Sequence, residues 1–262
     1  CRSMMYVPHA EYKKTLQTAA DNCDFEAKYG HLPFGEGVGI SGGYYISGTS
    51  YTLYLSYKPH TVANVKIENE NNVVLFCGTT DIGQGVDMVM AQMAAETLGI
   101  RSEDVKVVSR DTELATFDLG TFASRVTYAS GWAIRRACEA ANQLLFPVAA
   151  AIMGCRGQEV GVKDYQFYSI YEKKRKNVDW NEVVDQYISA NGPIITSGQF
   201  TPPRRKGIQQ GGNIGHSPTF GFTTQIAHVK VDLYTGLVHV LDITEAGDLG
   251  QPINPMSCEG QI

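Results

Sequence analysis

The chain has 262 residues, of which 43% are hydrophobic and 19% are charged, and its formal net charge at pH 7 is -5. This balance is typical of a globular protein with a sizeable core, in one domain or in two lobes. The acidic net charge disfavours a nucleic-acid partner. The basic runs 173–176 and 204–206 do not change this, because they are short enough to be solvated loops. No apolar run approaches the roughly 20 residues that span a bilayer.

The six cysteines and six histidines lack the paired spacing of a zinc or iron–sulfur site. We therefore predict no protein metal ligand, and cysteines without a disulfide pattern favour a cytoplasmic protein. The chain begins at Cys1 and ends at Ile262 in the middle of a pattern. We therefore expect it to be a fragment of a larger subunit.

The first third of the chain predicts one helix and a set of strands. Apolar spacing favours an amphipathic helix over 11–27, which is followed by glycines and a proline. Residues 61–69 and 72–77 predict a hairpin, and the glycine- and tyrosine-rich stretch 38–57 predicts a strand. Aromatic residues in such a strand either line a substrate pocket or, more commonly, pack against their neighbours.

A glycine-rich loop joins the end of this hairpin to a predicted helix. The loop contains Gly83, Gln84 and Gly85, and the helix is predicted over Val86–Leu98. A helix start offers unpaired backbone N–H groups and a positive dipole end, and glycines let a ligand approach the backbone closely. The spacing matches neither a dinucleotide fingerprint nor a phosphate-binding loop. A plain glycine turn ahead of a core helix therefore stays open as the alternative.

A second loop precedes a second long helix, which we predict from about Phe122 to Leu145. The first turn of that helix contains Ala123, Ser124 and Arg125, so its N–H groups could face the same ligand as the first loop. Ser124 and Arg125 either form a small anion pocket or are a capping serine beside a surface arginine. The small residues along the helix predict close packing against another element.

The rest of the chain predicts a helix behind a capping box at 179–182 and a long exposed connection over 201–215. Strands are predicted at 105–109, 222–231 and 237–243, and the glycine- and proline-rich tail 246–255 is predicted to be a loop. Some acidic residues in loops could act as bases, although capping and turn formation explain them equally well. They are Asp111, Asp118 and Asp248.

Four motifs in this order resemble the molybdenum-cofactor-binding subunit of the xanthine dehydrogenase and aldehyde oxidase family. They are Cys-Gly-Thr-Thr-Asp-Ile-Gly-Gln-Gly at 77–85, Asp-Leu-Gly-Thr-Phe-Ala-Ser-Arg-Val-Thr at 118–127, Val-Asp at 231–232 through Thr-Gly at 235–236, and Asp-Leu-Gly at 248–250 with Ile-Asn-Pro at 253–255 and Glu-Gly-Gln at 259–261. Within the family, the form of the first motif and of the strand around Tyr44 is most similar to 4-hydroxybenzoyl-CoA reductases.

The resemblance implies an α+β fold in which helices pack on mixed sheets, as part of the molybdenum-cofactor-binding domain. We expect an N-terminal helical segment at 1–33 and a molybdopterin-binding lobe at 34–200. An exposed connection at 201–215 would follow. Residues 216–262 would form a β-hairpin and the start of a next cofactor-binding segment.

The resemblance also implies roles for residues of both loops. Gly83, Gln84, Gly85, Ala123 and Ser124 would contact the pterin and phosphate of molybdopterin, or of its cytosine dinucleotide form. The dithiolene sulfurs of the pterin would hold molybdenum, so no protein ligand is needed.

By the same resemblance, Tyr44 and Tyr45 would lie near the substrate channel. The family's glutamate base would follow Ile262, which leaves no catalytic residue in this chain. The [2Fe-2S] clusters and FAD would belong to partner domains or subunits, and the rest of the molybdenum subunit would complete the site.

The resemblance implies an oxidoreductase acting on a small aromatic or heteroaromatic substrate, with 4-hydroxybenzoyl-CoA reduction as one form. The isolated fragment is expected to be inactive. The alternative is a structural or assembly member of the same fold that has lost the cofactor.

Overall fold

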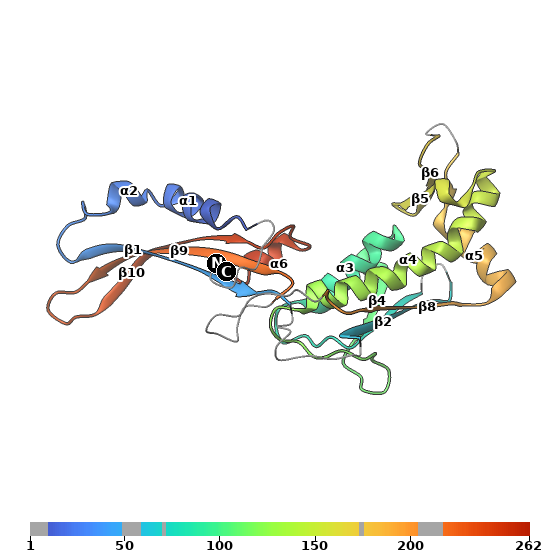
Figure 1. The fold of residues 1–262 in the computed structure, drawn as a ribbon, viewed down its shortest axis with the longest axis horizontal. Coiled ribbons are helices and arrows are strands. Elements are labelled where there is room, and N and C mark those ends of the chain that lie inside the picture. Colours follow the sequence, from blue (N-terminus) through green and yellow to red (C-terminus); the bar gives the residue numbers. More distant parts are fainter. Residues whose placement is uncertain (1–9, 49–58, 70–71, 173–175, 204–216) are drawn as a thin grey trace. The chain divides into compact units, whose positions relative to one another are not determined.

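The computed structural model describes residues 10–48, 59–69, 72–172, 176–203 and 217–262. These residues form two units (Figure 1). The first unit combines the two ends of the chain, 1–52 and 204–262, and the second unit is the continuous stretch 53–203.

The first unit is an antiparallel sheet covered by a helix. Its strand order is β1-β9-β10, and α1 lies along the sheet (Figure 1). The elements are α1 (Tyr12–Asn22), α2 (Phe25–Lys28), β1 (Glu36–Ile46), β9 (Phe220–Val231), β10 (Val238–Asp248) and α6 (Pro255–Glu259). A small core joins helix and sheet, where Ala19 of α1 packs with Ile226 of β9 and Ala246 of β10. Thr15 and Thr224 add a buried hydroxyl–hydroxyl hydrogen bond of 3.1 Å.

The turn between β9 and β10 forms because Asp232 accepts hydrogen bonds from the backbone N–H groups of Tyr234 and Thr235. These bonds stabilise the carboxylate and lower the pKa of Asp232. Gly236 has a φ of 74°, which glycine adopts without strain. The structure thus has a tight turn between the two strands that the sequence predicts at 222–231 and 237–243.

The second unit is a mixed sheet with two helices packed on it. The strand order is β4-β3-β2-β8, in which only β3 and β4 are parallel. The strands are β2 (Thr61–Ile67), β3 (Val73–Cys77), β4 (Val105–Val108) and β8 (Ile194–Phe200), and the helices are α3 (Val86–Leu98) and α4 (Val126–Met153). Between the parallel strands, α3 forms the crossover together with η1 (Ser102–Asp104).

A small-residue stripe on α4 allows close packing, as the sequence predicts. Ala133, Ala137 and Ala141 are fully buried. A Cβ atom on Gly198 of β8 would lie 2.1 Å from the carbonyl oxygen of Ala133, so only glycine fits there.

A smaller sheet lies beyond the C-terminal end of α4. It contains β5 (Val160–Lys163), β6 (Gln166–Ser169) and β7 (Val178–Asp179), preceded by η2 (Gly157–Glu159) and followed by α5 (Trp180–Asn191). Asp179 caps α5 by accepting a hydrogen bond from the N–H of Asn181, which confirms the predicted helix start.

The predicted hairpin and the helix at Val86–Leu98 are confirmed, but the bounds of the second helix are wrong. That helix, α4, starts at Val126 because Ala123 and Ser124 are left-handed. It also continues through Pro147 to Met153. The proline removes one hydrogen bond, while buried residues on both sides of it keep the helix on the core.

Three further expectations need correction or lie outside the described residues. The predicted helix over 11–27 is divided, since Asp24 has a φ of 54° between α1 and α2. The tail predicted as a loop is strand up to Asp248, because β10 pairs with β9 over that length, and it ends in α6. Most of the predicted connection at 201–215 lies outside the described residues.

The two units also divide the chain differently from the expected segments. The expected lobe at 34–200 includes β1, whereas β1 pairs with β9 along its full length and belongs to the first unit. This pairing joins residues that are far apart in sequence, such as Glu36 and Lys230.

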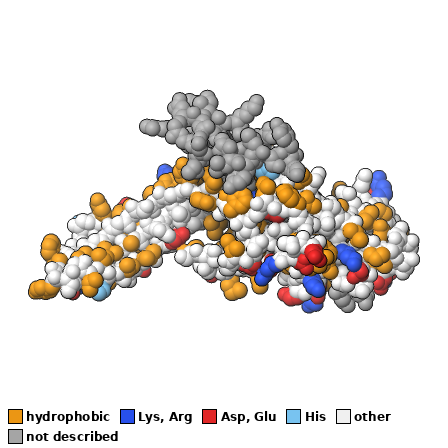
Figure 2. All heavy atoms as spheres, turned by 90° about the horizontal axis from the view of Figure 1, so that it is seen from below, with side chains coloured by type: hydrophobic (Ala, Val, Ile, Leu, Met, Phe, Trp, Pro, Cys, Tyr) orange, Lys and Arg blue, Asp and Glu red, His pale blue; other side chains and the backbone are white. Residues whose placement is uncertain are grey.

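On the face drawn in Figure 2, Lys and Arg side chains are interspersed with Asp and Glu, and hydrophobic side chains are spread among them. Among the residues that the structure describes, no helix is long and apolar enough to cross a membrane. No group of three or more His, Cys, Asp or Glu side chains in the same residues could hold a metal ion.

Candidate functional site

The loop between β3 and α3 is held together by its own side chains. One carboxylate oxygen of Asp81 accepts from the N–H groups of Gly83 and Gly85, at 2.9 and 3.3 Å. Oε1 of Gln84 accepts from the N–H of Ile82 at 2.7 Å, and Nε2 of Gln84 donates to the carbonyl of Thr80 at 3.3 Å. The amide of Gln84 therefore braces the loop from within.

The geometry of this loop and of the strand end before it explains why glycine occurs at three positions. Gly83 and Gly85 have φ values of 109° and 73°, which side-chain-bearing residues rarely adopt. A Cβ on Gly83 would meet no atom within 4 Å, so the backbone there is open to a ligand. A Cβ on Gly78 would lie 2.3 Å from the carbonyl oxygen of Thr116, so glycine permits the close approach of the second loop.

The first turn of α3 already carries a neutralised carboxylate. Asp87 accepts from the hydroxyl of Ser109 at 2.9 Å and forms an ion pair with Arg110. Beneath the loop, burial raises the pKa of the Cys77 thiol, whose sulfur lies 3.3 Å from Oγ1 of Thr79. The carboxylates of Asp81 and Asp87 therefore already occupy the amide N–H groups and the positive dipole end at this helix start.

The second loop presents a left-handed turn just before α4. Ala123 and Ser124 have φ values of 51° and 46° in succession, a conformation that costs roughly 1–2 kcal/mol for each non-glycine residue. The amide N–H groups of both residues make no hydrogen bond to any described residue. Because these two donors lie at a helix start, they suit an anionic oxygen of a ligand better than the first loop does.

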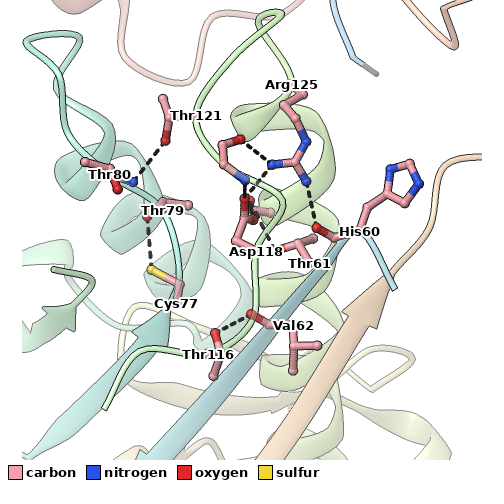
Figure 3. A network of polar contacts seen from close by, with 12 residues as sticks. His60, Thr61, Val62, Cys77, Thr79, Thr80, Thr116, Asp118, Thr121 and Arg125 are labelled. Carbon is pink, nitrogen blue, oxygen red and sulfur yellow. Dashed lines mark hydrogen bonds and ion pairs between the residues drawn. The ribbon is translucent and has the colours of Figure 1, made fainter. Parts of the chain in front are cut away.

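Arg125 holds this turn from beneath (Figure 3). Its Nη1 donates to Oδ1 of Asp118 at 2.5 Å and to the carbonyl of Gly120 at 2.7 Å, and its Nη2 donates to the carbonyl of His60 at 2.9 Å. The side chains of Asp118 and Arg125 are both fully buried. Oδ2 of Asp118 also accepts from the hydroxyl of Ser130 at 2.9 Å.

Two readings left open by the sequence are thereby corrected. Arg125 is not a surface arginine beside a capping serine and lines no anion pocket, because its guanidinium is buried beneath the loop. Asp118 is not placed to act as a base, since its oxygens accept from Arg125, Gly120 and Ser130 inside the protein.

The two loops lie side by side. The N–H of Thr80 donates to Oγ1 of Thr121 at 3.0 Å, and Figure 3 shows these two residues facing each other. Oγ1 of Thr116 donates to the carbonyl of Val62 at 2.5 Å and so ties the second loop to β2. The structure therefore brings together the two loops that the sequence singled out.

Tyr44 and Tyr45 belong to the first unit, where they lie on β1. They are 62% and 59% exposed, and the ring of Tyr44 packs against Phe220 and Phe222 of β9. This cross-strand contact is the ordinary packing role that aromatic residues have in strands.

Sequence reasoning missed the supporting residues of the second loop. The buried pair of Asp118 and Arg125 and the link through Thr121 carried no local signal, since arginine and aspartate are usually exposed. The available hint was that Asp118 and Arg125 lie on either side of Gly120 within one motif.

The family model of the molybdopterin cofactor-binding domain matches residues 13–262. The chain is 28% identical over 202 residues to the probable hypoxanthine oxidase XdhD of Escherichia coli K12, a match over 76% of this chain and 19% of that protein. It is 30% identical over 203 residues to the carbon monoxide dehydrogenase large chain of Hydrogenophaga pseudoflava, over 76% of this chain and 24% of that one. The matched region thus spans a quarter or less of both relatives.

The fold is similar to that of quinoline 2-oxidoreductase from Pseudomonas putida 86, with a TM-score of 0.77 at 21% identity, over 96% of this chain and 32% of that one. The predicted α+β class, with helices packed on mixed sheets, is confirmed. Since the family model covers nearly all of the sequence, this chain belongs to the molybdopterin cofactor-binding domain family.

Proposed function

We propose that the second unit binds the pterin and phosphate part of the molybdenum cofactor between its two adjacent loops. The observation that carries the proposal is the hydrogen bond between Thr80 and Thr121, which brings the Gln84 loop against the turn of Ala123 and Ser124. The N–H groups of that turn, which donate to none of the described residues, are donors that suit an anionic phosphate group.

The chain's own residues have separate tasks in this proposal. Ala123 and Ser124 donate their amides to an anionic oxygen of the cofactor. Gly83 and Gly85 let the pterin approach the backbone, and the amide of Gln84, already aligned by Ile82 and Thr80, lies beside it. When bound, the cofactor supplies the redox chemistry at a molybdenum held by its own dithiolene sulfurs.

We propose further that the complete protein is the molybdenum subunit of an oxidoreductase. Iron–sulfur and flavin domains or subunits carry electrons, and the remainder of the molybdenum subunit completes the site with its glutamate base. Tyr44 and Tyr45, which expose much of their rings, line the approach of substrate. The absence of a disulfide pattern in the sequence supports a cytoplasmic enzyme.

The substrate that we propose is a small aromatic or heteroaromatic compound. The names of the hypoxanthine and quinoline enzymes support this class, whereas the carbon monoxide enzyme shows that the fold also serves another chemistry. The form of the 77–85 motif, which resembles that of 4-hydroxybenzoyl-CoA reductases, makes 4-hydroxybenzoyl-CoA reduction one form of this proposal. Assays of the purified complex with an aryl-CoA substrate and with free aromatic and heteroaromatic substrates distinguish the two forms.

A structural or assembly member without cofactor is the less favoured alternative. The left-handed turn of Ala123 and Ser124 is costly, which is consistent with a ligand that uses the amides of this turn. The retained Gln84, held in a defined orientation, argues in the same direction.

The test measures molybdenum and pterin per chain in the complete complex, for the wild type and for Gln84→Glu. This change keeps an oxygen that accepts from Ile82 but removes the Nε2 donor and adds a negative charge beside the cofactor. We expect at least a tenfold loss of both contents. Gln143→Glu, on an exposed part of α4, is the matched control and retains them. Wild-type complex without molybdenum and pterin, or a fully loaded Gln84→Glu variant, overturns the proposal.

A further inference from the structure

We infer that Asp118 and Arg125 are positioning residues for the cofactor, because their buried ion pair holds the turn of Ala123 and Ser124 in its ligand-binding form. The inference rests on the proposed function and adds to it residues that do not touch the ligand. It explains how a costly turn is maintained before the ligand arrives.

The geometry of the ion pair closes a ring within the second loop. Asp118 lies at the start of the loop and Arg125 at its end, and their side chains meet beneath it at 2.5 Å (Figure 3). Gly120 is held twice, because its N–H donates to Asp118 at 2.8 Å and its carbonyl accepts from Arg125 at 2.7 Å. The backbone between these anchors has little freedom to leave the left-handed turn.

The same pair fixes the loop to the sheet. Arg125 donates to the carbonyl of His60, which also accepts from the N–H of Leu119 at 3.1 Å. Asp118 forms an isolated β-bridge with Thr61, at the start of β2. These contacts therefore fix the loop, and with it the turn, to the start of β2 in the second unit.

Burial and the shape of the guanidinium make this arrangement specific. Both side chains have no exposed area, so water does not screen their attraction. A planar guanidinium reaches three acceptors at once, which the single ammonium of lysine cannot do with the same geometry. The ring of Phe122 lies 5.7 Å from the guanidinium carbon and covers it. The pair thus acts as a rigid support under the amides of Ala123 and Ser124.

The ion pair also sets the distance between the two loops. Thr121, which accepts from Thr80 of the first loop, lies between the anchored Gly120 and the left-handed turn. Loss of the ion pair therefore loosens both the anion-binding amides and the contact with the Gln84 loop.

Two variants test the inference in the full complex. Arg125→Lys keeps the positive charge but loses the planar guanidinium with its several donors. Asp118→Asn keeps the shape of the side chain but loses its negative charge. Arg135→Lys is the matched control, because Arg135 is an exposed arginine of α4 that pairs with Glu139 outside this network. Molybdenum and pterin per chain are measured together with hydrogen exchange of the peptide 117–125.

We expect at least a tenfold loss of cofactor in Arg125→Lys and Asp118→Asn, with faster exchange at Leu119 and Gly120. Exchange in α3 should stay as in the wild type, which shows that the fold is kept. The control should match the wild type in both measurements. Should either variant fail to fold, the other one decides.

Two results would overturn the inference separately from the proposed function. Full cofactor content in folded Arg125→Lys and Asp118→Asn shows that the pair does not position the cofactor. Unchanged exchange at Leu119 and Gly120 shows that it does not hold the turn. A wild-type complex without cofactor instead overturns the proposed function, and the role toward the cofactor fails with it.

Discussion

The backbone N–H of Thr80 donates to Oγ1 of Thr121 across 3.0 Å, and this bond joins two loops that are 41 residues apart in the sequence. One loop ends at the start of α3 and the other at the start of α4. A single side chain thus aligns two helix starts. The arrangement gives several changes a defined expected outcome.

Replacing Thr121 by Val removes the acceptor at nearly constant shape. We expect the free energy of unfolding to fall by about 0.5–1.5 kcal/mol, because the net contribution of one such hydrogen bond is modest and Thr80 is exposed to water. The molybdenum content per chain should also fall clearly below that of the wild type, since the two loops lose their alignment. Denaturant unfolding and metal analysis measure the two effects.

Thr112→Val is the control for this change, because Thr112 lies in an exposed part of the chain between β4 and the turn of Ala123. It should alter neither quantity. A Thr121→Val protein with full cofactor content would contradict the role of the link.

The strain at Ala123 predicts stability effects of different size for two substitutions. Ala123→Gly relieves the left-handed strain but gives the unfolded chain more freedom, so stability should change by less than about 1 kcal/mol. Ala123→Val should cost about 2 kcal/mol or more, since a β-branched side chain disfavours a φ of 51°. Thermal unfolding of both variants provides the comparison.

Ala140→Gly is the reference, as Ala140 lies inside α4 with ordinary helical geometry. There the same change should cost about 1 kcal/mol. Equal costs at Ala123 and Ala140 would show that the turn is not left-handed in solution.

The sequence predicted α3 to the residue because its limits are local. Gly85 and Gly99 both adopt left-handed conformations at its ends, and apolar residues between them follow the helical period. These signals need no knowledge of the rest of the fold. The start of α4 lacks such a signal, since alanine at position 123 is itself the best helix former.

The late start of α4, after Ala123, follows from the packing of Arg125 against distant residues. Its buried contacts to Asp118 and His60 depend on how β2 and the second loop meet, which no local pattern records. The pairing of β1 with β9 was hidden for the same reason, because it joins the two ends of the chain. The motifs thus pointed to the two loops, while the bonds that hold these loops could be seen only in the structure.

The close packing of α4 on β8 predicts a large effect at Gly198. A methyl group there would lie 2.1 Å from the carbonyl oxygen of Ala133 and 2.5 Å from the nitrogen of Ala137. Because these are backbone atoms, helix and strand must separate, at a cost of about 1–3 kcal/mol or more. Denaturant unfolding should show this loss for Gly198→Ala.

Gly157→Ala provides the comparison in the same unit. Its Cβ would meet no atom closer than 3.8 Å, which is an ordinary contact. We expect a change within about 0.5 kcal/mol. Similar losses at both glycines would show that the packing of α4 on β8 is looser than described.

The last prediction concerns pH and His60, a residue only 2% exposed. Burial lowers its pKa, the Arg125 guanidinium lowers it further, and Asp118 acts in the opposite direction. The unfolded chain takes up a proton near the usual pKa of about 6.5, whereas the folded chain does so only at lower pH. Below about pH 6.5 the unfolded state therefore binds more protons, and stability falls as the pH falls towards the folded pKa.

We expect His60→Gln to flatten the pH dependence of stability in this window, while His31→Gln, at an exposed position, leaves it as in the wild type. Unfolding curves between about pH 5 and 7, on both sides of the usual histidine pKa of about 6.5, measure how the free energy of unfolding depends on pH. An unchanged slope in His60→Gln would show that His60 is not held neutral by its surroundings.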